Sequence, residues 1–141
     1  MASAKRAEFF LDSNFAIALI NAKDQHHAGA VSLARRLVGK ARLLTSEAVV
    51  FEIANALSKP RFRKNTIEFL RDLLTGEDTE VVRVSPALFT AAFHLYGERE
   101  DKAWSLTDCL SFVLMREHDL SNALTNDEHF EQAGFKALLR D

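Results

Sequence analysis

The chain has only one cysteine, Cys109, so it cannot form an internal disulfide, and a lone thiol is typical of a reducing cytoplasm. It also lacks long apolar runs, since none approaches the ~20 residues that a membrane span needs. The first residues, from Met1 to Arg6, lack the apolar stretch of a secretory signal. We therefore expect a cytoplasmic protein that does not associate with a membrane.

Neither sign of charge dominates, because 18 Lys and Arg residues stand beside 20 Asp and Glu residues, for a net charge of −2. Any binding to nucleic acid must therefore depend on local basic patches. The five glycines form no phosphate-binding loop, and no linker or internal repeat is visible. The 141 residues, 48% of them hydrophobic, predict a single domain (residues 1–141) with a substantial core.

Short apolar segments alternate with segments of helical periodicity along the chain. Strands are predicted at residues 7–12, 42–45, 81–84, 122–125 and 135–139. Helices are predicted at residues 14–21, 24–39, 46–58, 65–74, 85–97 and 107–117, and a short one through Phe130. Because hairpin signals are almost absent, this alternation predicts a three-layer α/β/α sandwich with a four- to five-stranded, mainly parallel sheet.

Four acidic residues, Asp12, Glu52, Asp108 and Asp127, lie near the points where one predicted segment gives way to the next. Asp12 ends the first strand, and Asp127 follows the fourth. Parallel strands present their carboxyl ends at one edge of the sheet, where ligands bind, so we expect the four carboxylates to share a cleft. Their mutual repulsion calls for a cation, and oxygen ligands favour Mg²⁺ or Mn²⁺. The sequence thus predicts a metal-dependent site for phosphate chemistry.

Glu52 is the most informative of the four. Between Ala48 and Leu57 only Glu52 and Asn55 are polar, so this helix is apolar almost all round and is expected to be buried. An ionised glutamate in a buried helix needs a partner.

The aspartates also fit purely structural roles. Asp12 and Asp127 are good N-caps, and Asp108 lies in a first helical turn, where a negative charge is favourable. Cys109 is expected to be a buried structural thiol. The five histidines show no zinc-ligand spacing, so zinc is not expected.

A basic segment follows the Glu52 helix, in which Phe62 lies among four cationic side chains. These are Lys59, Arg61, Arg63 and Lys64. One interpretation is a solvated turn between two helices. The other is an RNA-binding patch, because basic side chains supply most of the non-specific affinity for nucleic acid and Phe62 could stack on a base.

Four fragments occur in order along the chain: Phe10-Leu11-Asp12-Ser13-Asn14, Thr45-Ser46 followed by Glu52, Trp104-Ser105-Leu106-Thr107-Asp108-Cys109, and Leu124-Thr125-Asn126-Asp127 with Phe130. In these fragments the sequence resembles the PIN-domain ribonucleases over nearly its whole length, most closely the VapC-type toxins of type II toxin–antitoxin pairs.

This resemblance implies an endoribonuclease that uses Mg²⁺ or Mn²⁺ to cleave single-stranded or looped RNA, leaving a 5′-phosphate and a 3′-hydroxyl. It implies that Asp12 and Asp108 are metal ligands, and that Glu52 and Asp127 hold metal-bound waters or a second cation. It also implies a small antitoxin that blocks the cleft, and a homodimer.

Three alternatives stay open at the level of sequence. The chain could be a stand-alone PIN-type RNA-processing nuclease without an antitoxin, or a non-catalytic module that binds RNA or protein. An aspartyl-phosphate enzyme also places Asp at the end of its first strand, but its pattern wants a second Asp two residues on, where this chain has Asn14.

Overall fold

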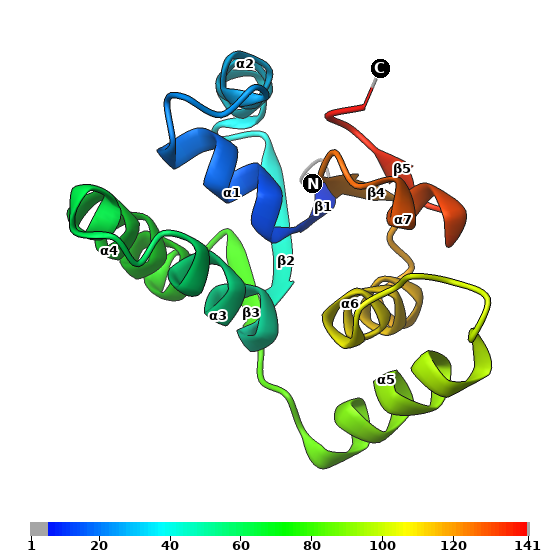
Figure 1. Cartoon of the computed structure of the whole chain (residues 1–141). Coiled ribbons are helices and arrows are strands. Elements are labelled where there is room, and N and C mark those ends of the chain that lie inside the picture. The colour runs from blue at the N-terminus through cyan, green and yellow to red at the C-terminus, as the bar shows by residue number, and fades with distance from the viewer. Residues whose placement is uncertain (1–5, 141) are drawn as a thin grey trace.

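The computed structural model describes residues 6–140 (Figure 1). Residues 1–5 lie outside the described part, so the expectation that the chain does not begin with a secretory signal falls largely on residues that are not described. None of the described helices has both the length and the apolar character needed to cross a membrane.

Five parallel strands form one sheet in the order β3-β2-β1-β4-β5. The strands are β1 (Ala7–Leu11), β2 (Ala41–Ser46), β3 (Thr79–Val82), β4 (Asn122–Leu124) and β5 (Lys136–Ala137). The predicted parallel sheet is confirmed. β4 and β5 are short, and both lie at the side of the sheet that carries the end of the chain (Figure 1).

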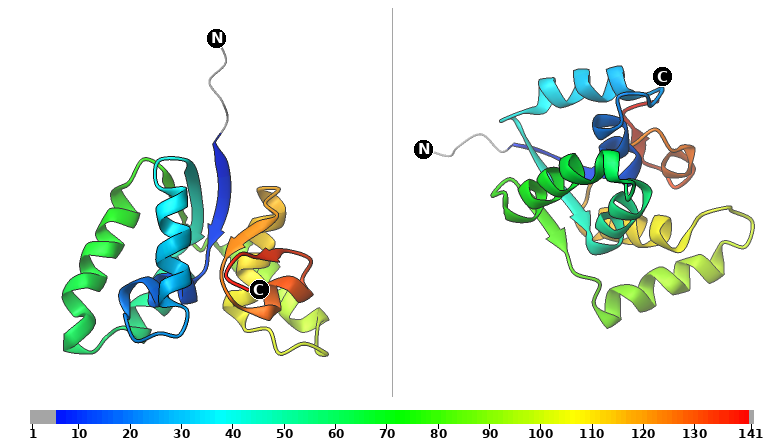
Figure 2. Two further views of the ribbon diagram at one scale, coloured as in Figure 1. Left: turned by 90° about the horizontal axis from the view of Figure 1, so that it is seen from above. Right: turned by 60° about the vertical axis from the view of Figure 1, so that its left-hand side comes forward.

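Helices cover both faces of this sheet (Figures 1 and 2). In the described part they are α1 (Ser13–Ile20), α2 (His27–Leu37), α3 (Glu47–Ala56), α4 (Pro60–Thr75), α5 (Pro86–Glu98), α6 (Leu106–Glu117) and α7 (Glu128–Gln132). Successive residues of β1 point to opposite faces. Phe10 therefore joins the core under α5, α6 and α7, whereas Leu11 joins the core under α1, α2 and α4. The predicted three-layer sandwich is confirmed.

The direction in which the chain adds strands reverses beside β1. From β1 the chain moves outward to β2 and β3, then crosses back to place β4 on the other side of β1. In open parallel sheets the crevice beyond the carboxyl ends of the strands at such a switch point is where ligands bind. Here that crevice lies beyond Leu11 and Leu124, which pair across β1 and β4.

An aromatic cluster fixes α7 against α6. The ring of Phe112 lies edge-on to those of Trp104 and Phe130, each with centroids 5.0 Å apart, and 5.8 Å from that of Phe135. Trp104 and Phe130 flank the segments that hold Asp108 and Asp127. This packing therefore sets how far apart those two aspartates lie.

Two predicted helix starts were wrong. α4 begins at Pro60 instead of Asn65, because proline suits the first helical position and Lys59 before it is extended. The basic segment is thus the beginning of a helix, not a turn between helices. α2 begins at His27, and Asp24 does not cap it: its carboxylate accepts a hydrogen bond from the backbone N–H of His26 in the preceding turn.

The expectation that the Glu52 helix is buried on all sides was also wrong. Within α3 only Val49 and Ile53 are buried, and Phe51 is 68% exposed. The helix lies at the carboxyl end of β2, with one side open to solvent (Figure 1). The position of Glu52 therefore needs an explanation other than burial of the whole helix.

Candidate active site

Asp12 is the most buried of the four acidic residues, with 4% of its surface exposed. It occupies the N-cap position of α1, but its side chain makes no capping hydrogen bond. Its Oδ2 instead lies 2.8 Å from Oγ1 of Thr125, which donates to it from beyond the neighbouring strand β4. Burial raises the pKa of Asp12 to about 7, and the charges of Glu52 and Asp108 add to this rise.

Short polar contacts bind the ends of the strands to one another around Asp12. Thr45, buried at the end of β2, donates from Oγ1 to the carbonyl oxygen of Leu11 at 2.7 Å. On the other side, Oδ1 of Asn14 accepts from the N–H of Asn126 at 3.1 Å and lies 3.1 Å from Oγ1 of Thr125. These contacts fix the Asp12 backbone relative to β2 and to the segment after β4.

Glu52 is half-buried and lies close enough to Asp108 and Asp127 for their charges to act on it. Burial raises the pKa of its carboxyl group, and the negative charges of Asp108 and Asp127 raise it further. A hydrogen bond with the side chain of Ser13, at the start of α1, opposes this rise. Glu52 thus belongs to the acidic group although its helix is not buried.

Asp108 lies in the first turn of α6 and forms a capping box with Ser105. Its Oδ2 accepts the backbone N–H of Ser105 at 3.1 Å, and Oγ of Ser105 accepts the N–H of Asp108 at 3.0 Å. Burial is the main cause of the raised pKa of Asp108, and the charge of Asp127 contributes. The structural role that the sequence suggested for this residue is therefore present, and it uses one carboxylate oxygen.

Asp127 caps α7, because its Oδ1 accepts the backbone N–H of His129 at 2.9 Å. Its own N–H donates to Oγ1 of Thr125 at 3.1 Å, so the hydroxyl that contacts Asp12 also holds Asp127. The structure thereby connects two of the predicted site residues through one threonine that the sequence reasoning did not single out.

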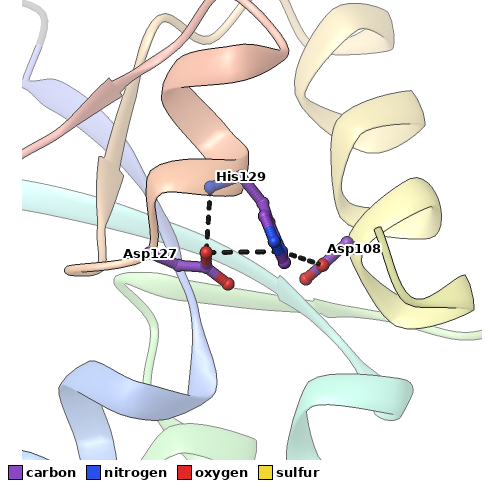
Figure 3. A group of neighbouring side chains, drawn as sticks. All are labelled: Asp108, Asp127 and His129. Atoms are coloured by element: carbon purple, nitrogen blue, oxygen red, sulfur yellow. Dashed lines mark hydrogen bonds and ion pairs between the residues drawn. The ribbon is translucent and has the colours of Figure 1, made fainter. Parts of the chain in front are cut away.

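His129 is a second residue that the sequence reasoning missed. Its Nδ1 lies 3.0 Å from Oδ2 of Asp108 and 3.4 Å from Oδ1 of Asp127 (Figure 3). One ligand atom from each of these three residues lies within 4.8 Å of the others. The available signal was the spacing Asp127-Glu128-His129 in a helical first turn, but nothing local showed that the ring would reach Asp108.

A family model described as the PIN domain matches residues 9–136. The chain belongs to the PIN-domain family. The resemblance to PIN domains inferred from the four sequence fragments is confirmed. No curated relative matches the sequence.

Solved structures share the fold over most of this chain. The toxin VapC20 of Mycobacterium tuberculosis, described as cleaving the sarcin–ricin loop, is 27% identical with a TM-score of 0.78, over 90% of this chain and 95% of that one. VapBC2 of Rickettsia felis bound to promoter DNA is 16% identical, with a TM-score of 0.66 over 92% and 96%. FitAcB of Neisseria gonorrhoeae is 15% identical, with a TM-score of 0.59 over 92% and 95%. Because the last two are only 16% and 15% identical to this chain, their likeness shows that the fold is shared and nothing more.

The acidic group of this PIN domain fits a hard divalent cation. All four carboxylates supply oxygen donors, which Mg²⁺ and Mn²⁺ prefer. Burial and mutual repulsion raise the pKa of Asp12, Glu52 and Asp108. Within residues 6–140, His129 is the one basic side chain that bonds to any of the four carboxylates. A bound cation would therefore offset charge that the protein itself leaves largely uncompensated.

The basic segment makes no direct bond to this group. No hydrogen bond or ion pair joins Lys59, Arg61, Arg63 or Lys64 to the four carboxylates in the described residues. Arg63 donates to the carbonyl oxygen of Ser58, and the guanidinium of Arg61 lies 4.7 Å from the centroid of the Phe62 ring. All four cationic side chains are exposed, whereas Phe62 is half-buried against the core.

Cys109 is fully buried, and burial raises the pKa of its thiol. A higher thiol pKa lowers the fraction of reactive thiolate. The interpretation of Cys109 as a structural thiol agrees with this environment.

The raised pKa of Asp12 predicts how stability depends on pH without divalent metal. Between about pH 4 and about pH 7 the folded state keeps a proton that the unfolded state has released, so stability falls as pH rises and levels off above that window. Asp12→Asn should remove most of this slope and raise the free energy of unfolding at neutral pH by about 2–4 kcal/mol. Denaturant titrations in chelator across this pH range measure both effects. Asp72→Asn, at an exposed position on α4, is the control. An equally steep slope in Asp12→Asn would contradict the assignment.

Proposed function

We propose that this chain, acting as a single PIN-type domain over residues 1–141, is an endoribonuclease dependent on Mg²⁺ or Mn²⁺. The observation that carries the proposal is the gathering of Asp12, Glu52, Asp108 and Asp127 at the switch point between β1 and β4. The likeness to VapC20, a toxin that cleaves the sarcin–ricin loop, supports RNA as the substrate.

In this proposal Asp12 and Asp108 hold the cation. When bound, the cation would lower the pKa of the water attached to it, so that a nucleophile is available near neutral pH. It would also offset the negative charge that builds up on the phosphate. Glu52 and Asp127 border the same space, where their carboxylate oxygens accept hydrogen bonds from water and orient it. Thr125 fixes the positions of Asp12 and Asp127 at once through its hydroxyl.

We further propose that the chain is the toxin of a toxin–antitoxin pair and acts in the cytoplasm. The antitoxin would be a small protein that covers the acidic crevice. The likeness to VapBC2 and FitAcB supports the fold on which this proposal rests. A small protein encoded in the adjacent reading frame that inhibits cleavage would support the pair. Its absence would favour a stand-alone RNA-processing nuclease of the same family.

Cleavage should depend on the acidic group and on divalent metal together. Asp108→Asn should lower the cleavage of RNA by ~100-fold or more, since loss even of an outer-shell partner of a metal ligand costs 10–100-fold. RNA binding should be kept, because the variant removes a negative charge. Mg²⁺ or Mn²⁺ should raise the melting temperature of the wild type, and Asp12→Asn should lose most of that shift.

Asp72→Asn is the matched control and should cleave RNA at the wild-type rate. The measurements are cleavage of a structured RNA with metal or with chelator, and thermal melts under the same conditions. RNA binding by the wild type without cleavage in any metal would point instead to a non-catalytic binding module.

The basic start of α4 is proposed as an RNA-binding surface, on the strength of its four exposed cationic side chains. Replacing both Arg61 and Arg63 by Ala should weaken RNA binding and flatten its salt dependence by about one unit of slope for each phosphate that is no longer bound. Turnover at saturating RNA should stay unchanged. Replacing Arg35 and Arg36, an exposed pair in the last turn of α2, by Ala is the matched control. Equal salt slopes in the two double variants would leave the α4 segment as a solvated helix end.

We also propose that the protein is a homodimer held together through the exposed side of α5. Phe89, Phe93 and Tyr96 recur at helical spacing there and are 49%, 58% and 49% exposed. Their rings form a row with centroids 6.1 Å and 6.4 Å apart. In a dimer with a two-fold axis, the aromatic row of one copy would pack against the same row of the other. Aromatic residues are enriched at such interfaces.

Phe93→Glu should therefore convert a dimer into a monomer, because it places a charge in the middle of the aromatic row. Light scattering coupled to size-exclusion chromatography measures the change in mass. Val38→Glu, at the end of α2 where the side chain is 75% exposed, should leave the dimer intact. A wild type that is monomeric at all accessible concentrations would rule out this assembly.

A further inference from the structure

His129 lies between two of the proposed site carboxylates and bonds to both. Figure 3 shows its ring between Asp127 at the start of α7 and Asp108 at the start of α6. The ring nitrogen Nδ1 is 3.0 Å from Oδ2 of Asp108 and 3.4 Å from Oδ1 of Asp127, while the backbone N–H of His129 donates to the same oxygen of Asp127. The ring is largely buried, with 24% of the side chain exposed.

These bonds use only one oxygen of each aspartate. On Asp108, Oδ2 accepts from the N–H of Ser105 as well as meeting His129. On Asp127, Oδ1 takes both contacts with His129. Among the described residues, nothing donates a hydrogen bond to Oδ1 of Asp108 or to Oδ2 of Asp127. Each aspartate is thus held in orientation by one oxygen and has its second oxygen free.

We propose that His129 is a positioning residue. Its Nδ1–H donates to Asp108 and its backbone N–H to Asp127, which aims the free oxygen of Asp108 at the divalent cation and that of Asp127 at the water beside it. The inference rests on the proposed function and assigns a residue outside the four acidic positions. A donor role suits the ring better than direct ligation, because Mg²⁺ and Mn²⁺ prefer oxygen ligands. Direct ligation through Nδ1 would also remove the hydrogen that Nδ1 donates to Asp108.

Hydrogen-bond partners behind metal ligands fix ligand orientation, and their loss commonly costs 10–100-fold in metal affinity. His129→Leu removes the donor while keeping a side chain of similar size. His129→Asn is nearly the same shape as the leucine variant and restores an N–H₂ donor close to the position of Nδ1. The two variants therefore differ mainly in the hydrogen bond. His118→Ala, at an exposed histidine after α6, is the control.

The experiment is a calorimetric titration of each protein with Mn²⁺ and with Mg²⁺, followed by RNA cleavage over a range of metal concentrations. His129→Leu should bind both metals ~10–100-fold more weakly, and excess metal should restore much of its turnover. His129→Asn and His118→Ala should bind them about as well as the wild type. Melting curves in chelator establish that each variant is folded. If the leucine variant does not fold, His129→Met, which also lacks a donor, takes its place in the comparison with His129→Asn.

Two results would overturn the inference. If His129→Leu is folded and binds metal like the wild type, the ring has no role in positioning. If His129→Asn binds as weakly as His129→Leu, the amide does not replace the ring, and a donor role for His129 is excluded. Either result with an active, metal-binding wild type leaves the proposed nuclease function standing. A wild type that neither binds metal nor cleaves RNA would instead remove that function.

Discussion

Electrostatic repulsion among four carboxylates is the constraint around which this site is built. Asp12 is almost fully buried, and Glu52 and Asp108 lie near it. Each negative charge therefore makes ionisation of the neighbouring carboxyl groups less favourable and raises their pKa. Within residues 6–140, the carboxylates are contacted by hydrogen-bond donors and by no lysine or arginine side chain. The donors are the hydroxyl of Thr125, the backbone N–H of Ser105 and the ring of His129. Donors of this kind hold the carboxylates in place and leave most of their charge for a cation to offset. A lysine or arginine in the same place would compete with the proposed cation.

The sheet topology makes this gathering of charge possible. Thr125 and Asp12 are 113 residues apart in sequence, yet they touch because β4 pairs directly with β1 after the chain has reversed its direction of strand addition. The aromatic cluster around Phe112 then fixes α7 on α6, so that His129 reaches Asp108. The site is thus assembled from segments that are distant in sequence and is held by packing outside the crevice. Loss of that packing would separate the two aspartates without changing either of them.

The fold and the acidic residues were accessible from sequence because each left a local pattern. Short apolar runs predicted the strands, and the acidic residues lie near segment boundaries. Glu52 was singled out because its helix was expected to be buried, and the exposed side of α3 contradicts that reason. His129 left no such pattern, since its role depends on how α7 docks against α6. The predicted start of α4 at Asn65 was wrong, because Pro60 ends the preceding helix and also suits the first position of the next one.

Asp108 and Asp127 also show why the structural and functional interpretations of an acidic residue at a helix start need not compete. A carboxylate has two oxygens, and capping a helix requires one of them. Asp108 accepts the N–H of Ser105 with Oδ2 and Asp127 accepts the N–H of His129 with Oδ1, so both caps are made with one oxygen each. The caps in turn lock the rotation of each carboxylate and fix where its second oxygen points. In this arrangement helix capping orients the second carboxylate oxygens, so the proposed cation site would depend on the same hydrogen bonds that stabilise the starts of α6 and α7.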